Sequence, residues 1–252
     1  MALIHNSLSE LVNYSTNFID LTLGEAFQKA KKLFPLLPDV FEIIGNKKIT
    51  DKGLHGKIVE TLIFGIKNNS KSCPDFTGLI ESEECAPDLK VTHLKEYANY
   101  PGEFTAKERL TCTNISRDEL AKCDNFDNSC YKNKCSNILL FVLKYNKIRT
   151  LEDLLNIKIL HIMHINIYTV YKSYIDEDWN YIYVMANDKT RKLSQRGQKY
   201  LHVHKHGSKG SQQRALGLKS KFVTEIIGKD LEKKDNKKHI TYGGRRKLFI
   251  KF

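Results

Sequence analysis

Residues 73–95 read CPDFTGLIESEECAPDLKVTHLK, and this stretch holds the most informative pattern of the chain. Its last part, LKVTHL (89–94), alternates apolar and polar residues in the manner of a β-strand. Side chains two residues apart on a strand point to the same face, so Asp88 and Lys90 should project together. Asp75 follows a proline in the loop just upstream. The stretch therefore predicts two carboxylates and an amine around a strand that is otherwise buried.

Two converging carboxylates can hold a hard cation such as Mg²⁺ through oxygen ligands. The cation polarises a phosphate and lowers the pKa of a bound water, and a neighbouring lysine can orient that water. Glu60, at the edge of a predicted upstream helix, can add a third carboxylate. The pattern predicts metal-dependent phosphodiester cleavage. The alternative is a surface hairpin with an ordinary Asp–Lys pair, because the same spacing recurs in the charged run 232–237.

The net charge of +12 is concentrated at one end of the chain. Residues 191–252 hold 18 Lys and Arg against 4 Asp and Glu, whereas the other 190 residues hold 23 against 25. A strongly basic segment beside a near-neutral body favours a polyanion partner, nucleic acid above all, bound through phosphate contacts. A nuclear-targeting or solubility role for the tail is the alternative.

Composition is that of a globular protein, with 41% hydrophobic and 28% charged residues among 252. No run approaches the ~20 apolar residues of a membrane helix, and the first residues lack the pattern of a signal peptide. We therefore expect an intracellular, cytoplasmic protein without membrane association. The six cysteines are expected to be free thiols rather than a zinc site, because Cys123, Cys130 and Cys135 lack the Cys-x-x-Cys spacing.

The periodicity of apolar residues predicts a mixture of helices and strands, and hence an α/β or α+β fold. Helices are expected at 21–34, 53–66, 152–159 and 219–234, and strands at 89–94, 108–115, 136–145, 159–171, 180–186 and 199–204. Polar loops are expected at 116–135 and 172–179, and the tail 235–252 is a final strand or an arm.

Seven segments form an ordered series along the chain: LTLGEAF (21–27), TDKGLHGKIVETLIFG (50–65), CPDF (73–76), PDLKVTHLK (87–95), FTAKERLTCTNI (104–115), YKNKCSNILLFVL (131–143) and RGQKYLHVHKHGSKGSQQRALGLKSKFVTEII (196–227). This series resembles the MutH-type DNA endonucleases. That family groups the mismatch-repair nicking enzyme with restriction enzymes that cut at GATC. The resemblance covers roughly residues 20–227.

The resemblance implies the α/β fold of restriction endonucleases, a mixed central sheet flanked by helices. It implies one domain over 1–252 whose two lobes form a DNA cleft, a catalytic lobe at about 20–145 and a recognition lobe at about 146–252. Asp75, Asp88 and Glu60 would bind Mg²⁺, Lys90 would be the catalytic lysine, and Lys134 would assist at the scissile phosphate.

The basic C-terminal region corresponds to the family's DNA-reading region. Lysine and arginine position phosphates, and arginine reads guanine best. The expected DNA-binding residues are Lys107, Arg109, Arg196, Lys199, Lys205, His206, Arg214, Lys219 and Lys221. An alternative for this region is a zinc site, because His202, His204 and His206 alternate along one strand face.

The chain departs from the family's pattern at three places. Asp88 stands where the family carries glutamate, and the loop before it is longer and adds Glu81, Glu83 and Glu84. In the recognition region, His206 falls at a base-contacting lysine. Gly217 falls at the tyrosine that the resemblance links to sensing adenine methylation. GATC specificity is therefore implied by the resemblance alone, and the departures at His206 and Gly217 disfavour cutting that adenine methylation blocks.

Taken together, these features predict a Mg²⁺-dependent endonuclease of double-stranded DNA, a type II restriction enzyme. The AKERL segment favours the restriction branch over a strand-nicking repair enzyme. The sequence is also compatible with a catalytically inactive DNA-binding lobe and with an RNA substrate. One chain carries one active site, so cutting both strands requires dimerisation on a palindromic site or two visits.

Overall fold

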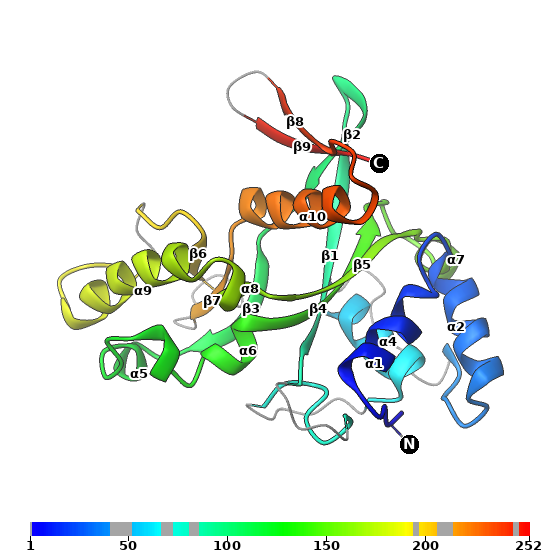
Figure 1. Cartoon of the computed structure of the whole chain (residues 1–252), viewed down its shortest axis with the longest axis horizontal. Helices are drawn as coiled ribbons and strands as arrows, with labels where there is room; N and C mark the ends of the chain where they lie inside the picture. The colour runs from blue at the N-terminus through cyan, green and yellow to red at the C-terminus, as the bar shows by residue number, and fades with distance from the viewer. Residues whose placement is uncertain are drawn as a thin grey trace. The chain divides into compact units, whose positions relative to one another are not determined.

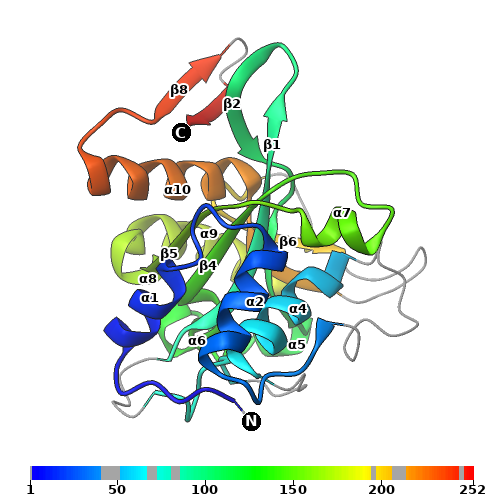
Figure 2. The same ribbon diagram turned by 90° about the vertical axis from the view of Figure 1, so that its right-hand side faces the viewer.

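The structure is a computed structural model that describes residues 2–40, 52–66, 73–80, 86–193, 197–205, 214–243 and 247–252. The chain divides into two compact units. Figures 1 and 2 label their helices and strands. Unit 1 comprises Met1–Lys95 and Leu139–His164, and unit 2 comprises Glu96–Ile138 and Ile165–Phe252. Among the described residues, no helix is both long and apolar enough to span a bilayer.

Unit 1 is built on three neighbouring strands in the order β5-β4-β1. The central strand is buried from Asn137 to Leu143, as expected for a continuous apolar run. Leu54, Ile58 and Leu62 of α4 belong to the same core cluster as Leu89 of β1. The elements of this unit are α1 (Leu8–Thr16), α2 (Leu23–Leu33), α4 (Lys52–Phe64), β1 (Asp88–Tyr97), β4 (Asn137–Lys144), α7 (Leu151–Leu155) and β5 (Ile159–Asn166).

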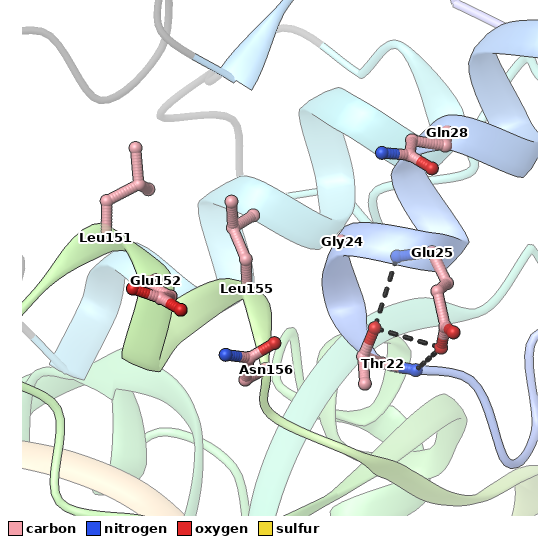
Figure 3. A pocket seen from close by; sticks show the side chains of 8 residues that line it. All are labelled: Thr22, Gly24, Glu25, Gln28, Leu151, Glu152, Leu155 and Asn156. Carbon is pink, nitrogen blue, oxygen red and sulfur yellow. Dashed lines mark hydrogen bonds between the residues drawn. The ribbon is translucent and has the colours of Figure 1, made fainter.

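The LTLGEAF segment forms the start of α2. Thr22 is its N-cap and exchanges hydrogen bonds with Glu25 in a capping box (Figure 3). Gly24 lets α2 approach α7 closely, because a Cβ at this position would lie 3.3 Å from the carbonyl oxygen of Leu155. The two helices border an open pocket of about 580 Å³. Its polar lining includes the capping pair itself, so the pocket marks a structural junction between α2 and α7.

Unit 2 contains two antiparallel three-strand groups, β2-β9-β8 and β3-β7-β6. The first group continues the strand order of unit 1, and the whole sheet reads β5-β4-β1-β2-β9-β8. The elements of this unit are β2 (Tyr100–Ala106), β3 (Leu110–Ile115), α5 (Arg117–Leu120), η1 (Phe126–Asn128), α6 (Lys132–Ser136), α8 (Ile167–Val170), α9 (Lys172–Asn187), β6 (Leu201–Lys205), β7 (Arg214–Leu218), α10 (Ser220–Asp235), β8 (Ile240–Gly243) and β9 (Lys247–Lys251).

The mixed six-strand sheet with flanking helices is consistent with the fold of restriction endonucleases, so the predicted α/β class is confirmed. The predicted strand at 180–186 and the predicted loop at 172–179 are wrong, because both lie in α9. The β-branched and aromatic content suggested a strand. Ile175, Trp179, Ile182 and Met185 are buried three or four residues apart, which is the spacing of one helix face.

One strand is shorter than predicted, and several elements were not predicted. The strand expected at 159–171 stops at Asn166, whose side chain accepts the N–H of Thr169 and starts α8. Helix α1 and strand β2 have no counterpart among the predicted elements. The tail forms two strands, β8 and β9, where at most one was predicted.

Candidate active site and nucleic-acid surface

Asp75 and Asp88 are held together by reciprocal hydrogen bonds within unit 1. The N–H of Asp75 donates to Oδ1 of Asp88 at 3.2 Å, and the N–H of Leu89 donates to Oδ2 of Asp75 at 3.0 Å. Phe76 anchors the turn between them, because its side chain is fully buried and its N–H donates to the carbonyl of Pro87. The chain therefore brings the two acids together from positions 13 residues apart.

Lys90 lies beside Asp88, as the strand alternation predicted. Its Nζ donates to Oδ2 of Asp88. The Asp88 side chain is 0% exposed and that of Lys90 is 16% exposed. A carboxylate buried this deeply requires a charged or hydrogen-bonded partner, and here the lysine supplies it.

The pKa of Asp75 is raised from its ordinary value to about 7. Burial is the largest cause, followed by the negative charge of Asp88, while Lys90 acts in the opposite direction. The negative charge of Glu60 on α4 also raises the pKa of Asp75, so Glu60 interacts electrostatically with this site. Three acids and one lysine thus create a locally negative site in which ionisation of Asp75 is unfavourable.

This donor chemistry fits a hard divalent cation. The candidate ligands are carboxylate oxygens, which Mg²⁺ prefers, and a cation would relieve the repulsion that raises the pKa of Asp75. Within the described ranges, no three His, Cys, Asp or Glu side chains form a ready metal cage. Asp75 and Asp88 would hold the ion, and Glu60, whose charge acts on Asp75, stays a predicted third ligand. Glu81, Glu83 and Glu84 lie outside the described residues.

A histidine pair joins two elements that carry site residues, and it was not predicted from the sequence. Nδ1 of His55 on α4 lies 2.8 Å from Nε2 of His93 on β1, and the ring centroids are 4.8 Å apart. The pair ties the helix that carries Glu60 to the strand that carries Asp88 and Lys90. Its signal in the sequence is weak, because each histidine merely sits among the apolar residues of its own element.

Of the predicted DNA-binding residues that the structure describes, Lys205 and Arg214 lie on strands of the β3-β7-β6 sheet, and Arg109 directly precedes β3. Arg109 Nη1 lies 3.2 Å from Nδ1 of His202, and arginine can only donate, so this nitrogen accepts. The pKa of His202 is lowered to about 4 by burial first, then by the charges of Arg109, His204 and Lys219. His202 is consequently a neutral imidazole near pH 7.

The zinc alternative for these histidines gains no support. His204 Nε2 lies 3.1 Å from the Thr111 hydroxyl, and its Nδ1 faces the carbonyl oxygen of His202. Within the part of the chain that the structure describes, no cluster of three potential zinc ligands occurs. His206, like Arg196, lies outside that part.

Some of the predicted DNA contacts already serve a structural purpose. Lys219 Nζ donates to the carbonyl of Gln198, and Lys199 Nζ lies 2.6 Å from Oε1 of Glu177. Lys205 and Lys221 are exposed, and Lys107 and Arg214 are half-buried. Lys199 is exposed as well, but its amine is already paired with Glu177, so Lys205 and Lys221 are the better candidates for phosphate contacts. Lys134, on α6, is half-buried in unit 2.

Gly217, which the resemblance places at a methylation-sensing tyrosine, lies in the central strand β7. A Cβ built on it would lie 2.3 Å from the carbonyl oxygen of Leu110 on β3. This contact is far inside van der Waals distance and involves backbone, so the strand pairing leaves no room for a side chain there.

Comparison with protein families gives one match. The family described as MutH, DNA mismatch repair enzyme, matches residues 64–178. The match covers a little under half of the chain and supports a MutH-like restriction-endonuclease assignment. The matched segment contains Asp75, Asp88, Lys90 and Lys134, whereas Glu60 lies just before it. A search of curated proteins finds no match. This family implies a DNA-binding nuclease of the restriction-endonuclease type.

Proposed function

We propose that the chain is a Mg²⁺-dependent, sequence-specific endonuclease of double-stranded DNA, a type II restriction enzyme that cuts at or near GATC. The observation that carries the proposal is the convergence of Asp75, Asp88 and Lys90 in a chain of the MutH-like family. A surface hairpin would not bury Asp88 completely or raise the pKa of a neighbouring carboxyl. Perturbed carboxyls of this kind are typical of active sites.

Each residue has a distinct role in this proposal. Asp75 and Asp88 hold the cation, and Glu60 supports it. When bound, the cation polarises the scissile phosphate and lowers the pKa of a bound water. Lys90 orients the attacking water by a hydrogen bond and offsets the negative charge that develops on the phosphate. Lys134 is proposed to stabilise charge at the same phosphate.

Recognition is proposed to rest on unit 2. The exposed Lys205 and Lys221 contact phosphates, and Arg109 contacts DNA near the β3-β7-β6 sheet. The close approach of the Leu110 backbone to Gly217 supports DNA recognition without a tyrosine at this position. We therefore expect cutting of adenine-methylated and unmethylated sites alike. Cutting of both strands requires two copies on a palindromic site or two visits by one copy.

The specificity is tested by digesting unmethylated and adenine-methylated plasmid with Mg²⁺ and sequencing the ends by run-off. Discrete fragments with ends at GATC from both substrates are the expected result. Ends at another sequence would contradict the GATC assignment. Persistent nicked circles would favour a repair-type nicking enzyme, and intact plasmid that is retarded on a gel would favour an inactive DNA-binding lobe.

A further inference from the structure

We infer that the hairpin of β8 and β9 is a second DNA-contacting element, a two-stranded ribbon that enters a groove of duplex DNA. The inference rests on the proposed function only in taking DNA as the ligand. The hairpin lies beyond the matched segment and beyond the residues 20–227 that resemble the family. None of the DNA-binding residues predicted from the sequence lies on it.

The shape of the hairpin suits this role. β9 pairs with β2 at Ile250 and Lys251, whereas its residues from Lys247 onward pair with β8. Among the described residues, Lys247 to Phe249 thus pair in the backbone with β8 alone, as in a ribbon of two strands. Figure 1 shows it extending past α10 beside β2. A ribbon of two strands is one of the two elements that fit the major groove of B-DNA.

The charge of the hairpin is complementary to DNA. The sequence from residue 236 to the end carries six Lys and Arg and no Asp or Glu. Lys247 and Lys251 are exposed, and Tyr242 on the edge strand is 72% exposed. Glu103 lies opposite Lys251 in the register and offsets part of this charge. Lysine, arginine and tyrosine are common donors to phosphate oxygens.

The base of the ribbon is rigidly anchored on the side of α10. Gly228 of α10 allows close packing, since a Cβ there would lie 2.5 Å from Cγ1 of Ile240. Glu232 accepts the backbone N–H groups of His239 and Ile240 at 3.1 and 3.0 Å, and Asp235 lies 2.9 Å from Nε2 of His239. Glu232 and Asp235 thus hold the base of the ribbon in place.

The opposite face is fixed by aromatic packing. Phe249 of β9 is 1% exposed and contacts the rings of Tyr97 and Tyr100, with centroids 5.3 and 5.5 Å away. Gly243 leaves room for the Phe249 ring. The Lys247 ammonium lies 4.3 Å from the centroid of the Tyr97 ring and donates to the Tyr97 hydroxyl, so a phosphate contact would compete with this bond. A preorganised ribbon loses little conformational entropy on binding.

A structural explanation for the lysines competes with DNA contact. Cations on an edge strand such as β8 and its neighbour also discourage pairing with other chains. This explanation predicts no change in DNA affinity when the lysines are replaced, and an increased tendency to aggregate. Binding and light-scattering measurements on the same variants separate the two explanations.

The test uses the full chain with non-specific duplex DNA in EDTA, so that no cleavage occurs. The double variant Lys247→Gln/Lys251→Gln removes the two ribbon cations, and Lys122→Gln/Lys189→Gln removes two exposed lysines elsewhere as a matched control. For the ribbon variant, the slope of log K against log[salt] should decrease in magnitude by about two relative to the wild type. Circular dichroism verifies folding of both variants.

A crosslinking experiment provides a readout that is independent of affinity. The photoreactive residue p-benzoylphenylalanine in place of Tyr242 should crosslink to duplex DNA, and the same residue in place of the exposed Val184 should not. The inference would be overturned if the ribbon variant kept the wild-type salt slope, or if the control variant showed an equal decrease. It would also be overturned if no crosslink formed at position 242. Failure of plasmid cleavage alone would count against the proposed function and leave the ribbon result intact.

Discussion

Replacement of Asp75 by asparagine isolates the electrostatic cost of the candidate site. The change is nearly isosteric, and the amide oxygen can still accept the N–H of Leu89, so the turn should be preserved. It removes the carboxyl whose pKa is raised to about 7 by burial and by Asp88. Between about pH 4 and pH 7, the free energy of unfolding of Asp75→Asn should therefore lack the pH dependence that this carboxyl gives the wild type.

The sign follows from the direction of the shift. The folded protein binds a proton at Asp75 more tightly than the unfolded chain does, so the contribution to stability is full below the ordinary pKa of 3.8 and is lost as pH rises through about 7. A shift of this size corresponds to about 4 kcal/mol, at about 1.4 kcal/mol per pKa unit. Asp75→Asn should consequently be more stable than the wild type at pH 8, by about 2–4 kcal/mol.

The assay is urea unfolding followed by circular dichroism at pH 5 and pH 8 in EDTA. The exposed Asp124→Asn serves as control and should leave the stability difference between the two pH values unchanged. Added Mg²⁺ should stabilise the wild type at pH 8 and have little effect on Asp75→Asn, because ligand binding to the folded state raises its stability. Equal or lower stability of Asp75→Asn at pH 8 would refute the reasoning.

Three further predictions concern other parts of the fold. Gly217→Ala should destabilise the protein by about 1–3 kcal/mol or more, because its Cβ would clash with the backbone beside β7. Gly56→Ala in α4 is the control and should not destabilise, because its Cβ would make only ordinary contacts. Urea unfolding measures the stability of both variants. Thr22→Ala should cost about 1 kcal/mol by removing the cap of α2, and wild-type stability would contradict it. Lys221→Ala should reduce the salt slope of DNA binding by about one. Lys219→Ala should mainly lower stability, because the Lys219 amine donates to the backbone carbonyl of Gln198. A loss of stability for Lys221→Ala and a change only in salt slope for Lys219→Ala would contradict this assignment.

Much of unit 1 could be predicted from local sequence. The alternation after Asp88 fixes the strand and places Lys90 on the same face, and the structure confirms that geometry. The apolar stripe of α4 likewise predicted the helix that carries Glu60. These features depend on the spacing of apolar residues within a single helix or strand, which can be read from the sequence alone.

Other features depend on contacts between distant segments. The hydrogen bond from Leu89 to Asp75 and the pairing of His55 with His93 arise only when the loop and α4 pack against β1. α9 was mistaken for a strand because its aromatic and β-branched residues favour strands locally. The helix is favoured because it buries Trp179 against Phe126 and Tyr131. This tertiary contact cannot be read from the sequence of residues 172–187 alone.

A metal-dependent nuclease site formed by Asp75, Asp88 and Lys90 has a simple functional signature. It is measured as the rate of relaxation of supercoiled plasmid by the wild type and by Lys90→Ala, with Mg²⁺ and with EDTA, alongside DNA binding by gel shift. We expect cleavage by the wild type with Mg²⁺, none with EDTA, and loss of cleavage with retained binding for Lys90→Ala. Cleavage by Lys90→Ala at the wild-type rate, or equal cleavage in EDTA, would show that these three residues are not such a site.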